Sequence, residues 1–161
     1  MASLPFPLAF SEVPQAWTDK YKEAKSAGLI PNIEPPKANS AGVVTYGANV
    51  KMSEVCNWEV DGCQLDSSIS MAPDGVLAIG LDDGATAAVD GLTKMLTEQN
   101  VTLSHFVIGS AIVNFPSAMT TLAQAKPAQH IACHSWSHLQ LPLFTDEELV
   151  ADLGWCQQIV S

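Results

Sequence analysis

Short apolar runs alternate with segments of helical periodicity over the second half of the chain, and this alternation limits the fold more than any other feature. The expected strands lie at 76–81, 103–109 and 130–134, and the expected helices at 87–99, at 116–125 and from the capping box at Thr145 to Val160. Three strand–helix units in succession are typical of a parallel sheet or barrel with right-handed crossovers. In such folds the functional groups lie at the carboxyl ends of the strands.

The first half of the chain has a different composition. Good helix formers over 16–27 predict one short helix, and the proline- and glycine-rich stretch 30–55 predicts an extended arm. Cys56 and Cys63 flank a short loop and would pair in an oxidising compartment; two free thiols are the alternative. The predicted division is an N-terminal helix, arm and cysteine loop over 1–75, and the strand–helix region over 76–161.

The charge of the chain restricts its partners. The chain has seventeen acidic residues, seven lysines and no arginine, which gives a formal net charge of -10. Such a chain would repel nucleic acid and anionic lipid surfaces, so we expect a neutral or cationic substrate. No apolar run has the length of a membrane span. The N-terminus has no recognisable signal peptide, so we expect either a cytosolic protein or a mature form without its leader.

Two groups of polar residues follow predicted strands. Asp82 and Asp83 end the first strand, whereas His134 and His138 lie at the end of the third. Two imidazoles and a carboxylate suit Zn²⁺ and other late transition metals, and an i, i+4 pair lies on one face if the segment is a helical turn. If Asp83 binds the metal, Asp82 is held nearby and can act as a general base. Two unrelated surface histidines and a solvated Asp-Asp-Gly turn are the alternative.

Other nucleophiles and ligands fit less well. No G-x-S-x-G elbow surrounds Ser135 or Ser137, for which we expect supporting or structural roles. Cys133 is predicted to be a buried core residue, and Trp136 to line the metal site. The first two cysteines are too far apart for a zinc knuckle, which disfavours a purely structural zinc site.

A family resemblance rests on two motifs and on the sequence around them. Gly80-Leu81-Asp82-Asp83-Gly84 is similar to a T-F-D-D-G motif, and His134 to His138 match H-S/T-x-x-H. The likeness extends over AWTDKYKEAKSAGLIPNI, VCNWEVDGC and HSWSHLQLPLFTDEELVADLGW. In these segments the chain resembles the polysaccharide deacetylases of carbohydrate esterase family four, and most closely the secreted chitin deacetylases of mushroom-type fungi. The resemblance implies an α/β fold, a partial (β/α) barrel of the polysaccharide deacetylase type.

The resemblance also implies roles for individual residues. Asp82 would be the general base, and Asp83, His134 and His138 would hold one divalent metal, zinc or else cobalt. The implied reaction is hydrolysis of N-acetyl groups from chitin or related N-acetylglucosamine polymers, outside the cell or in the cell wall.

The chain departs from the family pattern in ways that bear on activity. Gly80, Leu81 and Ala85 replace the usual residues of the first motif, which changes packing around the base. The family's third motif supplies an arginine that orients the base, and this chain has none; neither His105 nor His130 stands in the motif that supplies the acid. We expect a truncated domain with low turnover, because loss of a general acid costs about 10²–10⁴-fold in rate. A non-catalytic chitin-associated or structural protein is the alternative, and the open sheet edges favour self-association.

Overall fold

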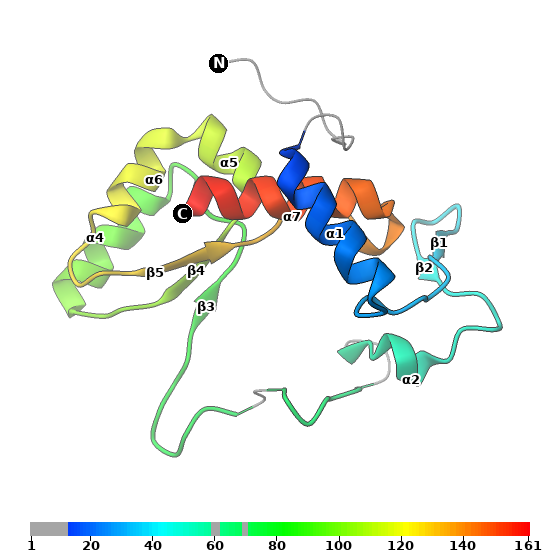
Figure 1. Cartoon of the computed structure of the whole chain (residues 1–161). Helices are drawn as coiled ribbons and strands as arrows, with labels where there is room; N and C mark the ends of the chain where they lie inside the picture. Colours follow the sequence, from blue (N-terminus) through cyan, green and yellow to red (C-terminus); the bar gives the residue numbers. More distant parts are fainter. Residues whose placement is uncertain (1–12, 59–61, 69–70) are drawn as a thin grey trace.

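The computed structural model describes residues 13–58, 62–68 and 71–161. A parallel sheet forms the centre of the strand–helix region, in the order β3-β4-β5 (Figure 1). Its strands are β3 (Gly80–Leu81), β4 (Ser104–Val107) and β5 (His130–Cys133). Leu81 pairs with His105, and Val107 pairs with Cys133. The fold is mixed α/β, as predicted, and a parallel sheet of three strands is consistent with part of a barrel.

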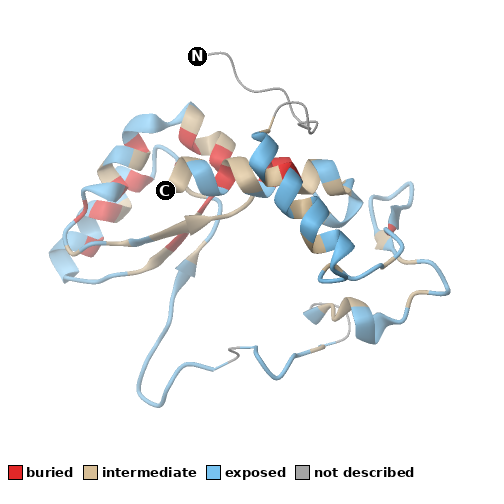
Figure 2. Ribbon diagram, in the orientation of Figure 1, coloured by how far each residue is buried: buried red, intermediate tan, exposed pale blue. Residues whose placement is uncertain are grey.

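Helices cover the face of the sheet on which the core lies. They are α4 (Val89–Gln99), α5 (Gly109–Asn114), α6 (Pro116–Ala123) and α7 (Asp146–Val160), with a 3-10 turn at Leu141–Leu143. Along β4, His105 and Val107 are buried, while the intervening Phe106 is only half-buried. Val107 packs with Val89 of α4 and Leu122 of α6 in the main apolar cluster, and buried positions follow this interface in Figure 2. The period-2 burial of β4 shows which face the helices occupy.

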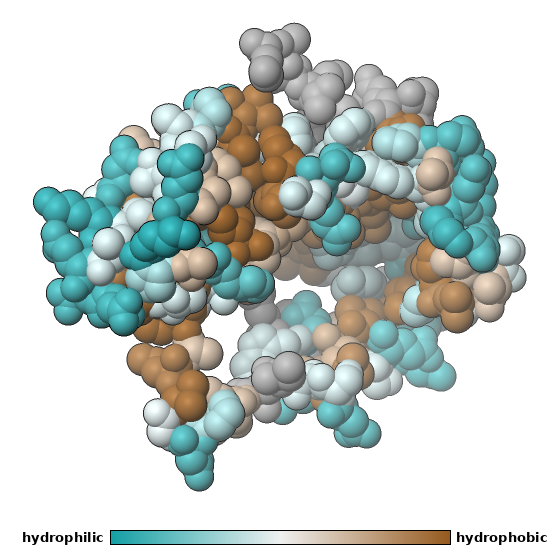
Figure 3. All heavy atoms as spheres, turned by 60° about the vertical axis from the view of Figure 1, so that its left-hand side comes forward, coloured by the Kyte–Doolittle hydropathy of each residue, from teal (hydrophilic) through white to brown (hydrophobic). Residues whose placement is uncertain are grey.

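Two predicted boundaries in this region are wrong. Only Gly80–Leu81 of the expected strand 76–81 is paired as a strand. The carbonyl of Ile79 still accepts the amide of Ser104 at 3.2 Å, but β4 begins at Ser104 and offers residues 76–78 no partner. Leu77 is 82% exposed in consequence, and apolar surface is visible along this protruding segment in Figure 3. The strand expected over 103–109 ends at Val107, and its last residue instead begins α5.

The helix predicted from 116 is confirmed, and a sequence feature explains why it is separate from α5. Phe115 interrupts the helix with φ -129° and ψ 59°, and Pro116 takes the first position of α6. Proline restricts the residue before it to non-helical conformations, and its ring suits the start of a helix. Helix α7 begins after Thr145 with the predicted capping box.

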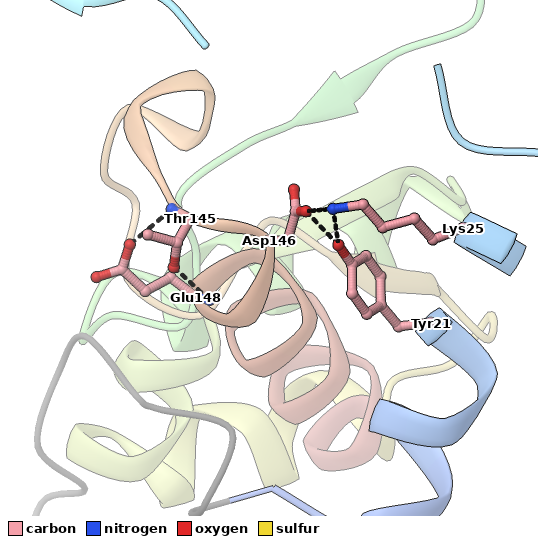
Figure 4. A network of polar contacts seen from close by, with 5 residues as sticks. All are labelled: Tyr21, Lys25, Thr145, Asp146 and Glu148. Atoms are coloured by element: carbon pink, nitrogen blue, oxygen red, sulfur yellow. Dashed lines mark hydrogen bonds and ion pairs between the residues drawn. The ribbon is translucent and has the colours of Figure 1, made fainter. Parts of the chain in front are cut away.

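The N-terminal half packs on the domain through one helix. The predicted helix is confirmed as α1 (Gln15–Ser26). The rings of Trp17 and of Trp155 in α7 pack in an edge-to-face arrangement at a centroid distance of 5.3 Å. A second contact joins Tyr21 and Lys25 of α1 to Asp146 at the start of α7 (Figure 4). These contacts fix α1 across α7.

The arm contains more regular structure than the sequence predicts. Strands β1 (Lys37–Ala38) and β2 (Val44–Thr45) form a small antiparallel pair, and α2 (Met52–Val55) precedes the cysteine loop. The predicted Cys56–Cys63 disulfide is present. The division of the chain at residue 75 stays a prediction. Within the described ranges, every helix is too short or too polar to cross a membrane.

Candidate metal centre

The loop after β5 carries both histidines. The amide of His134 donates to the carbonyl of Val107 at 2.9 Å, which continues the parallel ladder by one residue. Beyond it the chain does not form the helical turn that the i, i+4 spacing suggested. Ser135 and His138 have positive φ values of 59° and 58°, and the amide of His138 donates to the Ser135 hydroxyl at 2.9 Å. The two rings therefore come together through an irregular loop.

Asp83 meets these histidines from the end of β3. One of its carboxylate oxygens, Oδ1, lies 3.0 Å from Nε2 of His138 and 3.4 Å from Nε2 of His134. The two imidazole rings are tilted by 37°, with centroids 5.2 Å apart. Asp83 itself has a φ of 70°, a left-handed conformation that aspartate tolerates better than most residues. The structure thus brings together all three residues that the sequence predicted as metal ligands.

The spacing of these donor atoms fits a transition metal. The three ligand atoms lie within 4.8 Å of one another. Tetrahedral zinc with bonds of about 2.0–2.2 Å places its ligand atoms roughly 3.3–3.6 Å apart. Neutral imidazoles and one carboxylate also match the ligand types that zinc prefers. The side chains of His134 and Asp83 remain 31% and 64% exposed, so water and a substrate can approach the group.

Asp82, the predicted base, adjoins Asp83 in the chain and is exposed. It lines a pocket of about 300 Å³ together with Asp83, Thr86 and the buried His105. Nε2 of His105 lies 3.3 Å from Oε1 of the Gln129 side chain. Asp82 therefore lies at the carboxyl end of β3 as expected, beside the carboxylate of the candidate metal centre.

Two residues near the histidines differ from their predicted roles. Trp136 is only 5% exposed, and its ring packs on Gly109 beneath the loop, so it does not line an open site. Cys133 is half-buried rather than buried in the core, and it forms a disulfide with Cys156. Ser135 and Ser137 have the structural role expected. The Ser135 hydroxyl accepts the amide of His138, three residues later, and the Ser137 hydroxyl accepts the amide of Leu139, two residues later.

Sequence reasoning missed one residue next to this centre. Asp152 of α7 is fully buried and accepts hydrogen bonds from the histidine loop. A signal was available: Asp152 stands between Leu149 and Cys156 on one stripe of the helix, where an apolar residue is normal. A carboxylate at such a position is rarely buried without a specific partner.

Comparison with known proteins identifies the class of protein. The family model for polysaccharide deacetylase matches residues 70–161, and the chain belongs to this family. Chitin deacetylase 3 of Cryptococcus neoformans is 34% identical over 156 residues, which cover 94% of this chain and 36% of that protein. A chitin deacetylase of Amylomyces rouxii is 29% identical, over 81% of this chain and 32% of its own length.

A solved structure is also similar. Peptidoglycan deacetylase PdaC from Bacillus subtilis matches with 25% identity and a TM-score of 0.48, over 52% of this chain and 41% of that one. The chain spans about a third of the length of the curated relatives named above. The family resemblance predicted from the two motifs is confirmed.

Proposed function

We propose that this chain hydrolyses N-acetyl groups of chitin or related N-acetylglucosamine polymers at a metal centre formed by Asp83, His134 and His138. The observation that supports the proposal best is the meeting of one carboxylate oxygen and two imidazole nitrogens within 4.8 Å, at the ends of two strands. The names of the curated relatives, which are chitin deacetylases, supply the substrate.

Each residue has a distinct task in the proposed reaction. Asp83, His134 and His138 hold the ion, zinc or else cobalt, and their exposure leaves room for the amide. When bound, such an ion supplies Lewis acidity that stabilises the charge developing on the carbonyl oxygen. Asp82 takes the proton from the attacking water. It is suited to this because its neighbour binds the ion while its own carboxylate stays free to accept a proton.

Charge and disulfides agree with this substrate and with a location outside the cell. Chitin is neutral and its deacetylated product is cationic, so a chain of net charge -10 repels neither. The disulfides Cys56–Cys63 and Cys133–Cys156 are typical of an oxidising compartment. We therefore propose an extracellular or cell-wall location.

A second candidate is a non-catalytic chitin-associated or structural protein. It is favoured by Gly80, Leu81 and Ala85, which replace the usual residues of the first motif and change the packing around Asp82. Self-association is compatible with either proposed function. In the described sheet β3 and β5 each pair with β4 alone, so each leaves an edge on which a second copy could add a strand.

The test uses the 161-residue chain with its disulfides intact. We expect one Zn²⁺ to bind per chain and acetate to be released from N-acetylglucosamine oligomers. Asp83→Asn should weaken zinc binding at least about 10-fold, because it removes an anionic ligand. Asp82→Asn should retain zinc and lose about 10²-fold or more of the acetate release. Asp74→Asn, in an exposed turn, is the matched control and should change neither.

Three results would decide against parts of the proposal. Zinc binding that is absent, or equal in Asp83→Asn, contradicts the metal centre. Zinc binding without acetate release, combined with chitin binding that survives Asp82→Asn, supports the non-catalytic candidate. Acetate release that is unchanged in Asp82→Asn removes that residue from the role of base.

A further inference from the structure

Asp152 of α7 is a buried carboxylate whose two oxygens serve one short stretch of backbone. Its side chain is 0% exposed. Oδ1 accepts the amide of Trp136 at 2.8 Å, and Oδ2 accepts the amide of Ser137 at 3.0 Å. Removing a carboxylate from water is costly unless hydrogen bonds replace the lost hydration. Among the residues that the structure describes, the ion pairs do not include Asp152, so these two amides carry the compensation.

The two amides lie in the segment that separates the candidate ligands. Trp136 and Ser137 are the third and fourth residues of the five that run from His134 to His138. Left-handed backbone occurs on both sides of them, at Ser135 and at His138 itself. Non-glycine residues keep such a conformation only when surrounding contacts determine it. Asp152 supplies such contacts.

Carbonyl groups of the same segment accept hydrogen bonds from the start of α5. The amide of Gly109 donates to the carbonyl of Ser135 at 2.9 Å, and the amide of Ser110 donates to that of Trp136 at 3.1 Å. The Trp136 residue is therefore fixed through its N–H by α7 and through its C=O by α5. Helix α7 is in turn bonded to the strand before the loop by the Cys133–Cys156 disulfide.

We propose that Asp152 is a positioning residue: by holding the Trp136 and Ser137 amides it sets the loop conformation in which His134 and His138 both face Asp83. The inference rests on the proposed metal centre. Both carboxylate oxygens are needed, because the two amides are separate donors. An asparagine offers one oxygen, and its NH₂ group would face the second amide, donor against donor.

The test compares Asp152→Asn with a destabilising substitution far from the loop. Leu96→Ala removes a buried side chain of α4 and should lower stability without touching the histidines. Each folded chain is titrated with Co²⁺, and the visible absorption spectrum reports both affinity and ligand geometry. Asp152→Asn should bind Co²⁺ about 10–100-fold more weakly with altered bands, as loss of an orienting partner does in other metal sites. Leu96→Ala should bind like the unmodified chain.

The outcomes separate this inference from the proposed function. If the unmodified chain binds no Co²⁺, the metal centre itself is refuted. If it binds Co²⁺ and Asp152→Asn binds equally well with the same spectrum, only the role of Asp152 is refuted. Equal weakening in Leu96→Ala would mean that stability alone explains the effect, and would also overturn the inference.

Hydrogen exchange in the unmodified chain tests the same point if Asp152→Asn does not fold. The amides of Trp136 and Ser137 should exchange more slowly than the amide of Leu139, which is accepted by an exposed loop hydroxyl. Exchange of all three at one rate would show that Asp152 does not hold the loop.

Discussion

The contact between Gly109 and Trp136 gives a prediction whose size can be worked from the structure. A Cβ atom added at Gly109 would lie 2.5 Å from Cε3 of the Trp136 ring and 3.2 Å from two further ring atoms. Ordinary carbon contacts are about 3.5–4.0 Å, so the ring or the helix would have to move by about 1 Å. Trp136 is 5% exposed and both of its backbone polar groups are bonded, which leaves little room to move.

Gly109→Ala should therefore destabilise the protein. Overpacking of this kind costs about 1–3 kcal/mol. Gly91→Ala is the matched control, because Gly91 also lies in the first turn of a helix, and a Cβ there meets nothing within 4 Å. Gly91→Ala should gain at most about 0.5–1 kcal/mol of stability, the effect of replacing a glycine in a helix by alanine. The difference between the two variants isolates the clash with the indole ring.

Urea unfolding with both disulfides intact measures this difference. With a slope of about 2 kcal/mol per molar urea, the midpoint of Gly109→Ala should lie roughly 0.5–1.5 M below that of Gly91→Ala. We also expect weaker Co²⁺ binding in Gly109→Ala, because the displaced ring belongs to the residue between the two histidines. Equal midpoints for the two variants would show that the Trp136 ring is not packed against Gly109, and would refute the reasoning.

Two further predictions concern the start of α7, shown in Figure 4. Thr145→Ala should lower the free energy of unfolding, measured in urea, by about 1 kcal/mol, because the Thr145 hydroxyl accepts the Glu148 amide in the capping box. The control is Thr120→Ala, which removes an exposed hydroxyl within α6 and should leave stability nearly unchanged. Hydrogen bonds from Lys25 and then Tyr21 hold the pKa of Asp146 below its ordinary value of 3.8. A carboxyl whose folded pKa is lowered stabilises above its unfolded pKa and loses that contribution as pH falls. The stability difference between the unmodified chain and Asp146→Asn should therefore be small and constant from about pH 5 to about pH 9, begin to fall near about pH 4, and vanish only as the pH drops through the lowered pKa of the folded state. A difference that grows on acidification would contradict the ion pair.

The order of elements was predictable from the sequence, whereas their ends were not. Apolar runs and helical periodicity are local signals, and they placed all three strands and the helices α4, α6 and α7, but not the short α5 directly after β4. Where a strand stops depends on its neighbour. The run 76–79 is as apolar as β3 itself, but it extends past the first residue of β4, and only the Ile79 carbonyl is bonded to that strand. The residues of the run themselves do not indicate where β4 begins.

The candidate metal ligands were predictable, and the residues that support them were not. Asp83, His134 and His138 belong to motifs that can be read from residue types alone. The partners of the loop come from α5 and α7, so their roles depend on how those helices return to the sheet. The bond between Cys133 and Cys156 shows the same limit, because the sequence suggested a bridge only between Cys56 and Cys63, and the packing of α7 on β5 brings the second pair together.

The two sides of the metal centre differ in how firmly they are held. The histidine loop is bonded to α5 and α7 and lies over the buried Trp136 ring. Asp83, by contrast, follows a strand with two paired residues, and the segment before that strand is exposed. Preorganised ligands bind a metal without a further ordering cost, whereas a mobile ligand must lose conformational freedom on binding. The carboxylate side should therefore limit metal affinity, and additional pairing along the free edge of β3 should increase that affinity more than additional packing of the histidine loop.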